Sequence, residues 1–210
     1  LNSNSYNIEK FDFLISYPPY SIDGYMRNLI KNGITPESGD FSLLKRINYN
    51  DSAIETLFVE RAEQLLKKEG YVAIVLPQSI LSNVKYENMR RFILDNFIIK
   101  GMLMTSDITF SGTTTSPVIL FLKKEKCVNY AYETLIIGSP KYISPTGSKM
   151  KNKEVKFLGY EFSSNRSKTG VTIYDDSILK SITPLVKEFI VKGICNIPAN
   201  LKEYVCVKKL

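Results

Sequence analysis

The stretch FDFLISYPPY, residues 11–20, decides how the fold is read. Its apolar first part predicts a buried β-strand. Pro18 and Pro19 follow directly, with a tyrosine on each side. Proline fixes φ, lacks an N–H and pushes the residue before it toward extended geometry. We therefore predict that Tyr17 and Tyr20 are held on a stiff bend at the end of a strand, a position suited to chemistry.

Helix and strand signals alternate after this bend. The strand over 11–16 is followed by a polar loop and by an amphipathic helix over 51–70, with Asp51 or Ser52 as its N-cap. The sequence YVAIVLP at 71–77 has almost no polar alternation, which is typical of a parallel strand covered on both faces. This order predicts two parallel strands joined by a helix.

A hairpin is expected next. A helix over 86–97 leads into a strand over 98–104, and a Gly- and Thr-rich loop joins that strand to another over 116–125. The loop is too short for a crossover helix, so an antiparallel hairpin is favoured. The expected fold class is therefore α/β, with a mostly parallel sheet that ends in an antiparallel pair.

The pattern weakens toward the C-terminal end of the sequence. Short strand signals alternate with Lys- and Ser-rich loops, and a short helix is predicted over 175–191. We therefore expect a main domain over 1–126 and a small irregular extension over 127–210.

The composition is that of a globular, basic protein. Of its 210 residues 44% are hydrophobic, and 28 Lys and Arg against 21 Asp and Glu give a net charge of +7. This balance favours a polyanionic partner such as nucleic acid, with solvated lysine faces as the alternative. The absence of histidine excludes His-dependent triads and His metal sites, and three scattered cysteines predict neither disulfides nor a zinc site. Without an apolar run of about 18 residues or a signal peptide, we expect a cytoplasmic protein with no membrane partner.

Four stretches, in this order, carry a resemblance to a known family. They are FDFLISYPPY (11–20), GYVAIVLPQSIL (70–81), DITFSGTTTSPVILFLKK (107–124) and FLGYEFSSNRSKTGV (157–171). Together they resemble the second half of DNA methyltransferases that methylate the amino group of adenine, above all the modification subunits of type I restriction systems and their single-chain fused relatives. The resemblance implies the C-terminal half of a Rossmann-like methyltransferase sheet.

The resemblance also implies roles for the residues of the bend. In the family, the target amine donates hydrogen bonds to a side-chain oxygen of Asn, Asp or Ser at the first motif position and to the backbone carbonyl that maps to Pro18. Pro19 keeps the bend rigid, and Tyr20 maps to the aromatic ring that stacks on the flipped adenine. Phe110 maps to a ring on the other face of the base, and a loop phenylalanine tucked into the core is the alternative.

Tyr17 departs from the family pattern at the first motif position. A neutral phenol is bulky and mainly a hydrogen-bond donor, so it replaces a compact acceptor poorly. We therefore expect that this copy is inactive, either by natural change or because the residue was altered to silence it.

The methyl donor is implied only for a longer parent protein. In the family, the glycine loop and the acidic residue that bind S-adenosylmethionine precede the motif, and only ten residues precede Phe11 here. We therefore expect S-adenosylmethionine as the cofactor of the parent and little binding by this chain. Double-stranded DNA and specificity and restriction subunits, or fused regions, are the implied partners.

The charged residues outside the bend form two groups, a basic stretch and three acidic residues on the predicted helices. A basic stretch could contact DNA phosphates, with a solvated loop as the alternative. Glu55, Glu60 and Asp95 are interpreted as helix-surface charges. The residues proposed to contact DNA are Lys149, Lys151, Lys153 and Arg166.

Taken together, these features predict a fragment of a DNA methyltransferase that transfers a methyl group from S-adenosylmethionine to the amino group of adenine and is inactive by itself. The alternative is a non-catalytic DNA-binding or scaffold module with a decayed methyltransferase fold. A third reading treats the likeness as accidental in another small α/β protein.

Overall fold

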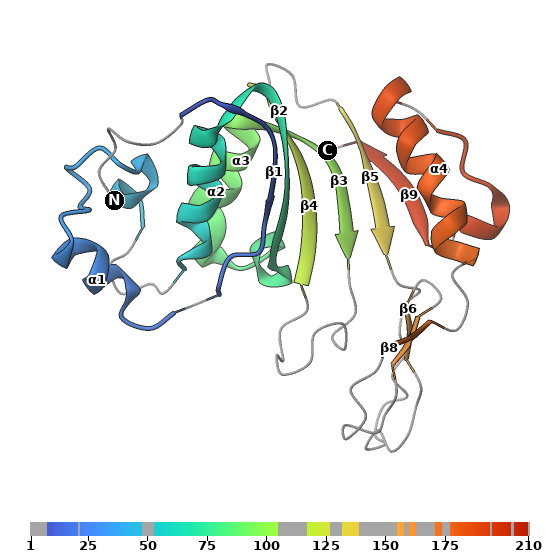
Figure 1. Cartoon of the computed structure of the whole chain (residues 1–210), viewed down its shortest axis with the longest axis horizontal. Helices are drawn as coiled ribbons and strands as arrows, with labels where there is room; N and C mark the ends of the chain where they lie inside the picture. Colours follow the sequence, from blue (N-terminus) through green and yellow to red (C-terminus); the bar gives the residue numbers. More distant parts are fainter. Residues whose placement is uncertain are drawn as a thin grey trace.

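A six-stranded mixed sheet forms the centre of the fold in the computed structural model (Figure 1). The strand order is β1-β2-β4-β3-β5-β9. The strands are β1 (Phe11–Ser16), β2 (Leu66–Pro77), β3 (Phe97–Met104), β4 (Pro117–Lys124), β5 (Glu133–Gly138) and β9 (Val205–Lys209). The structure describes residues 8–20, 22–47, 53–104, 117–126, 132–138, 155–157, 160–162, 171–173, 177–193, 195–202 and 204–209.

The strand directions confirm the expected fold class. β1 is parallel to β2, and β3 is parallel to β5. β4 lies antiparallel between β2 and β3, and β9 is antiparallel to β5. Four strands therefore run in one direction and two in the other. The β3–β4 pair is the hairpin that the short connecting loop predicted.

Helices α2 and α3 cover one part of this sheet. Buried side chains of both helices join those of β2, β3 and β4 in one apolar core. A second core lies between α4, β5 and β9. The helices are α1 (Tyr25–Lys31), α2 (Glu55–Leu65), α3 (Glu87–Asn96) and α4 (Ser177–Lys192), with 3₁₀ turns η2 (Ser42–Lys45), η3 (Gln78–Leu81), η4 (Val84–Tyr86) and η5 (Ala199–Leu201). A separate small sheet contains β6 (Val155–Phe157), β7 (Tyr160–Phe162) and β8 (Val171–Ile173). Among the described residues, no helix is both long and apolar enough to cross a membrane.

The exposure of β1 corrects the prediction of a buried strand. Phe11, Phe13 and Ile15 lie on one face of the strand and are 41%, 56% and 78% exposed. Leu14 points the other way and packs against the main core. A strand is buried on both faces only where a layer covers each face, and no described element covers the face of Phe13.

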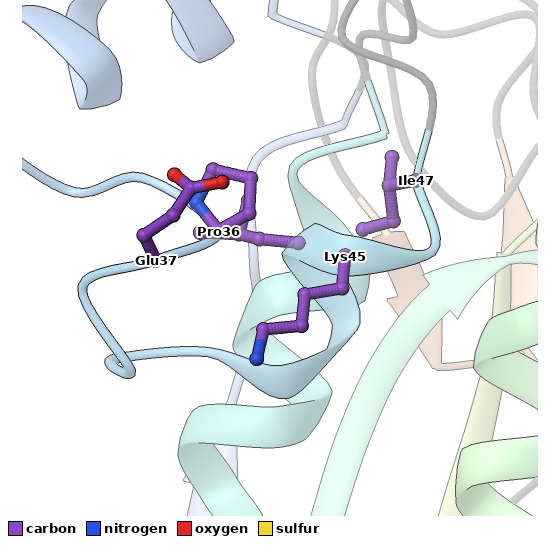
Figure 2. A pocket seen from close by; sticks show the side chains of 5 residues that line it. Pro36, Glu37, Lys45 and Ile47 are labelled. Carbon is purple, nitrogen blue, oxygen red and sulfur yellow. The ribbon is translucent and has the colours of Figure 1, made fainter.

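A small lobe lies between β1 and α2 in the sequence and contains α1 and η2. Its own apolar cluster includes Met26, Leu29, Phe41 and Leu44, and it reaches Leu57 of α2. The lobe carries an open pocket, with Pro36 and Glu37 on one side and Lys45 and Ile47 on the other (Figure 2).

The junction between α2 and β2 differs from the predicted helix over 51–70. The helix ends at Leu65 and the strand begins at the next residue. Glu69 has a positive φ of 66°, and a Cβ on Gly70 would lie 3.1 Å from the carbonyl oxygen of Phe11. Gly70 is therefore required by the close approach of β1 and does not mark the end of a helix. The predicted caps Asp51 and Ser52 lie outside the described residues.

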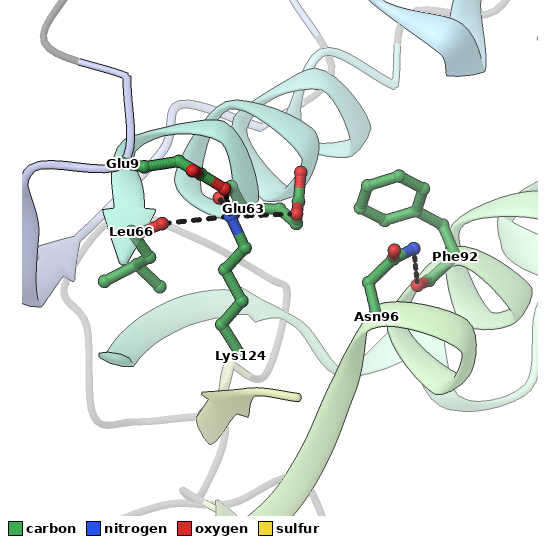
Figure 3. Close-up of polar contacts among 6 residues, drawn as sticks. All are labelled: Glu9, Glu63, Leu66, Phe92, Asn96 and Lys124. Atoms are coloured by element: carbon green, nitrogen blue, oxygen red, sulfur yellow. Dashed lines mark hydrogen bonds and ion pairs between the residues drawn. The ribbon is translucent and has the colours of Figure 1, made fainter. Parts of the chain in front are cut away.

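Lys124 explains in part why α2 ends where it does (Figure 3). From β4, its Nζ donates hydrogen bonds to the backbone carbonyls of Glu63 and Leu66, at 2.8 and 2.9 Å. It also forms ion pairs of 3.1 Å with the carboxylates of Glu9 and Glu63. Carbonyls at a helix end have no partner within the helix, so a cation placed there stabilises the end.

Candidate functional site

The predicted bend lies at the carboxyl edge of the parallel strands. β1 ends at Ser16, which pairs with Ile74 of β2, and β2 continues to Pro77. Because the two strands are parallel, their carboxyl ends meet at one edge of the sheet (Figure 1). The helix between two parallel strands runs back across the sheet, so α2 begins at this edge as well. In open α/β sheets, ligands bind at this edge.

The rings of the bend contact each other. Tyr17 and Tyr20 meet edge to face, with ring centroids 5.8 Å apart and an angle of 83° between the planes. The ring of Tyr17 is 56% exposed, and Pro18 is buried. Residues 17–20 have no regular secondary structure and directly follow β1. The predicted position of both tyrosines after a strand is thus confirmed, while their chemical roles stay predictions.

Tyr20 is half-buried. Its hydroxyl oxygen is shielded from solvent. Burial raises the pKa of the Tyr20 hydroxyl well above its ordinary value, and the neighbouring Tyr17 and Glu55 raise this pKa further. Tyr20 is therefore a neutral aromatic ring throughout the physiological pH range.

Glu55 is a buried member of this edge, contrary to its interpretation as a surface charge. It is the first residue of α2, and it is 0% exposed. Its carboxylate accepts a hydrogen bond from the hydroxyl of Tyr86, a residue that is itself 1% exposed. An isolated buried carboxylate is costly, so such a partner is needed. Sequence reasoning missed this pair because the two residues are 31 positions apart and lie in different elements.

Tyr86 belongs to a loop that is fixed in several places. The guanidinium of Arg90 donates hydrogen bonds of 2.7 Å to the carbonyls of Ile80 and Asn83. The Nζ of Lys85 lies 4.7 Å from the centre of the Tyr86 ring. The segment after β2 therefore presents Tyr86 to Glu55 from a braced turn.

Glu60 is also buried, which again corrects its interpretation as a surface charge. It is 3% exposed, and its carboxylate accepts hydrogen bonds from the backbone N–H groups of Ser42 and Leu43, at 2.5 and 2.9 Å. Glu60 thereby caps η2 and attaches the lobe to α2. The third acidic residue of this group, Asp95, is exposed as predicted.

Two further contacts attach the lobe to the helices. The side-chain amide of Gln64 donates a hydrogen bond of 2.9 Å to the carbonyl of Asp40. The guanidinium of Arg61 lies 4.5 Å from the centre of the Phe41 ring. The lobe that follows the bend is therefore held by the same helix that carries Glu55.

Several predicted site residues lie outside the described residues. The segment with Phe110 connects β3 to β4, and its described neighbours Met104 and Pro117 lie at the carboxyl edge of β3. The roles of Phe110 and of the four basic residues therefore stay predictions. These four are Lys149, Lys151, Lys153 and Arg166.

The expectation that this chain binds little S-adenosylmethionine, the donor that the family implies, stays a prediction. A glycine loop that lets a ligand approach the backbone would mark such a pocket. Gly70 and Gly101 are crowded by the backbone of neighbouring strands, and a Cβ on Gly24, Gly33 or Gly39 would meet nothing within 4 Å. A Cβ on Gly138, the last residue of β5, would have only the Cβ of Met104 nearby, at 4.0 Å. Among the described residues, no group of three or more acidic or cysteine side chains could hold a metal ion.

Two curated restriction-modification proteins are similar to this chain. RM.Eco57I of Escherichia coli, a type II restriction enzyme and methyltransferase, is 30% identical over 125 residues, which are 59% of this chain and 12% of that protein. The methylase subunit of the type I restriction enzyme MpnII of Mycoplasma pneumoniae is 27% identical over 127 residues, 59% of this chain and 22% of that protein. The chain thus spans less than a quarter of the length of either relative.

Solved structures share the fold. The methyltransferase subunit of a type I restriction-modification system from Streptococcus thermophilus matches with a TM-score of 0.58 and 18% identity, over 89% of this chain and 34% of that one. The type IIG restriction endonuclease BpuSI matches with a TM-score of 0.54 and 12% identity, over 97% of this chain and 19% of that one. At these identities the likeness concerns the fold alone.

A family model settles the resemblance that the four stretches indicated. The model described as N-6 DNA Methylase matches residues 1–172, which include the bend, α2, β2 and the β3–β4 hairpin. The chain belongs to the N-6 DNA methylase family.

Proposed function

We propose that this chain is the adenine-binding part of an N-6 adenine DNA methyltransferase from a restriction-modification system. The observation that carries the proposal is the placement of Tyr17-Pro18-Pro19-Tyr20 at the carboxyl edge of β1, where the Tyr20 ring is held against Tyr17. Membership of the N-6 DNA methylase family supports it. In the complete protein, S-adenosylmethionine is the methyl donor, and residues other than those described here form most of its pocket.

The bend would bind the target base in two ways. Tyr20 offers a neutral aromatic face on which an adenine flipped out of the duplex stacks. The backbone carbonyl of Pro18 accepts a hydrogen bond from the adenine amino group, which helps its delocalised lone pair to become nucleophilic. Phe110 would close the other face of the base.

Tyr17 favours a second candidate function. A neutral phenol donates its proton more readily than it accepts one, and its ring stands where a compact Asn, Asp or Ser would leave room for the base. With Tyr17 in place, the chain would act as a non-catalytic DNA-binding or scaffold module that retains the methyltransferase fold. Duplex DNA is the proposed partner in both cases, with specificity and restriction subunits, or fused regions, as protein partners.

A binding experiment tests the base-stacking role. In a Tyr17→Asn variant, which removes the competing ring, we expect tighter binding to a duplex with an adenine opposite an abasic site than to the same duplex fully paired. Tyr20→Ala should abolish this preference, a loss of ~1–3 kcal/mol for one stacked base. Tyr20→Phe should keep it, because the ring remains.

Phe13→Ala provides the matched control. Phe13 is an aromatic residue of the same segment, 56% exposed on β1, but it does not belong to the bend. Its replacement should leave the preference for the unpaired adenine unchanged. A preference that survives Tyr20→Ala would show that the bend is only a turn.

A further inference from the structure

The contact between Glu55 and Tyr86 lies beside the bend and has no role in the proposed chemistry. Both side chains are buried, at 0% and 1% exposure, and the Tyr86 hydroxyl donates a hydrogen bond to the Glu55 carboxylate. Desolvation of a carboxylate costs several kcal/mol, so hydrophobic side chains of similar size would often be at least as stable here. Stability alone is therefore a weak explanation for this pair.

The position of Glu55 reduces the cost of its burial. As the first residue of α2, it lies at the N-terminal end of the helix, where the helix dipole favours negative charge. The Tyr86 hydroxyl supplies a further donor from η4. The pair thus joins the start of α2 to the braced turn after β2.

These two elements stand next to the aromatic bend. The start of α2 and the segment after β2 lie at the same carboxyl edge of the sheet as the bend (Figure 1). Burial raises the pKa of the Tyr20 hydroxyl, and the neighbouring Tyr17 and Glu55 raise this pKa further. Tyr20 contacts the ring of Tyr17, and its shielded hydroxyl belongs to the same edge of the sheet as the Glu55–Tyr86 pair.

We propose that Glu55 is a positioning residue which, through its hydrogen bond from Tyr86, holds the buried side of the bend and fixes the Tyr20 ring in the orientation needed for base stacking. The inference rests on the proposed function, because base stacking is what gives the orientation of the Tyr20 ring its use. The orientation itself is measurable without any DNA.

The first test therefore observes the ring contact directly. In the 210-residue chain, tyrosine-labelled NMR should show through-space contacts between Tyr17 and Tyr20, whose ring centroids are 5.8 Å apart. Tyr86→Phe removes only the donated hydrogen bond, and Glu55→Ala removes the acceptor. Both should weaken or abolish these contacts, whereas Glu55→Gln keeps an acceptor oxygen and should preserve them.

Glu60 supplies a matched control for general destabilisation. It is a buried glutamate on the same helix, and its carboxylate binds backbone N–H groups of the lobe. Glu60→Ala should lower the thermal midpoint and leave the Tyr17–Tyr20 contacts in place. If Tyr86→Phe leaves the ring contacts unchanged, or Glu60→Ala disrupts them equally, the positioning role is wrong.

The second test connects the orientation to base binding by a double-mutant cycle. In the Tyr17→Asn background, Tyr86→Phe should weaken the preference for the unpaired adenine by a smaller factor than Tyr20→Ala, which should cost about 5- to 150-fold. In a Tyr20→Ala background, Tyr86→Phe should have no further effect, because coupled residues are not additive. Additive losses would overturn the proposal.

The two tests separate the two hypotheses. If Tyr20→Ala has no effect on the unpaired adenine but Tyr86→Phe still displaces the Tyr20 ring, the proposed function fails and the positioning role stands. If Tyr20→Ala has its effect and Tyr86→Phe neither moves the ring nor changes binding, the positioning role fails and the proposed function stands.

Discussion

The rings of Tyr17 and Tyr20 meet edge to face, so the first and last residues of the bend form one aromatic pair. The separation of 5.8 Å and the near-perpendicular planes are those of a favourable edge-to-face contact. This contact places a donor side chain and an exposed ring where the proposed reaction needs a small acceptor.

Tyr17→Asn is therefore expected to raise methyl transfer. In a protein that combines this chain with a donor-binding part, one well-placed acceptor should increase the rate on the order of 10²–10³. Labelled methyl incorporated into DNA measures the change. Tyr17→Phe is the control, because it keeps the ring and should give no more methyl transfer than the chain with Tyr17. Equal incorporation by the natural chain and by the Tyr17→Asn variant would remove the first motif position from the mechanism.

DNA binding by the chain should depend steeply on salt. The net charge of +7 and the four predicted phosphate-binding residues imply release of counterions on binding. Replacing Lys149, Lys151, Lys153 and Arg166 by alanine should flatten the slope of log K against log salt by about 0.9 for each phosphate that is no longer neutralised. Fluorescence anisotropy at several salt concentrations gives this slope. An unchanged slope would mean that these side chains only face solvent.

Lys124→Met should destabilise the fold, because it removes the cation that stabilises the C-terminal end of α2. Its side chain is 13% exposed and binds two backbone carbonyls, which would lose their partner. We expect a loss of roughly 1–3 kcal/mol in the free energy of unfolding, measured by urea denaturation. Lys67→Met is the comparison, because the Lys67–Asp12 ion pair is exposed and should contribute less than about 1 kcal/mol. Equal effects of the two variants would contradict the role of Lys124 at the helix end.

The Lys123–Glu125 pair should give the fold a small dependence on pH. The hydrogen bond from Lys123 lowers the pKa of Glu125, and the same bond raises the pKa of Lys123. Because the folded pKa of Glu125 lies below its unfolded value, its contribution is complete above the unfolded pKa and is lost as pH falls through the folded pKa. The contribution of Lys123 is complete below its unfolded pKa and is lost as pH rises through its folded pKa.

Glu125→Gln tests the acidic side of this dependence. Between neutral pH and about pH 3, the variant should lose less stability than the natural chain, because its amide does not titrate. Urea midpoints at the two pH values measure the difference. An equal or larger loss in the variant would contradict the assignment.

The β1–β2 parallel pair and the β3–β4 hairpin were predictable because their signals are local. The continuous apolar run at 71–77 and the short loop before 116–125 predicted β2 and the β3–β4 hairpin. The helix predicted over 86–97 agrees with α3 within a residue at each end. The helix at 51–70 was predicted too long, because Gly70 serves the approach of Phe11 from a distant strand.

The buried acids were not predictable from the sequence for a related reason. Glu55 and Glu60 have the spacing and composition of a solvated helix face, and nothing near them in the sequence indicates burial. Their partners Tyr86, Ser42 and Leu43 come from other elements. The bend was found because proline stiffness is a local property, whereas the support behind it depends on tertiary contacts.

The exposed face of β1 has a practical consequence for handling the chain. Phe11, Phe13 and Ile15 line a strand that has a partner on one edge only among the described residues, and such strands template aggregation. Asp12 is 81% exposed between the two phenylalanines in sequence, and we expect its charge on this edge strand to oppose pairing of copies. Asp12→Asn should therefore lower the soluble yield and raise light scattering while leaving the unfolding midpoint almost unchanged. We therefore expect one carboxylate at the start of β1 to limit the self-association of this chain.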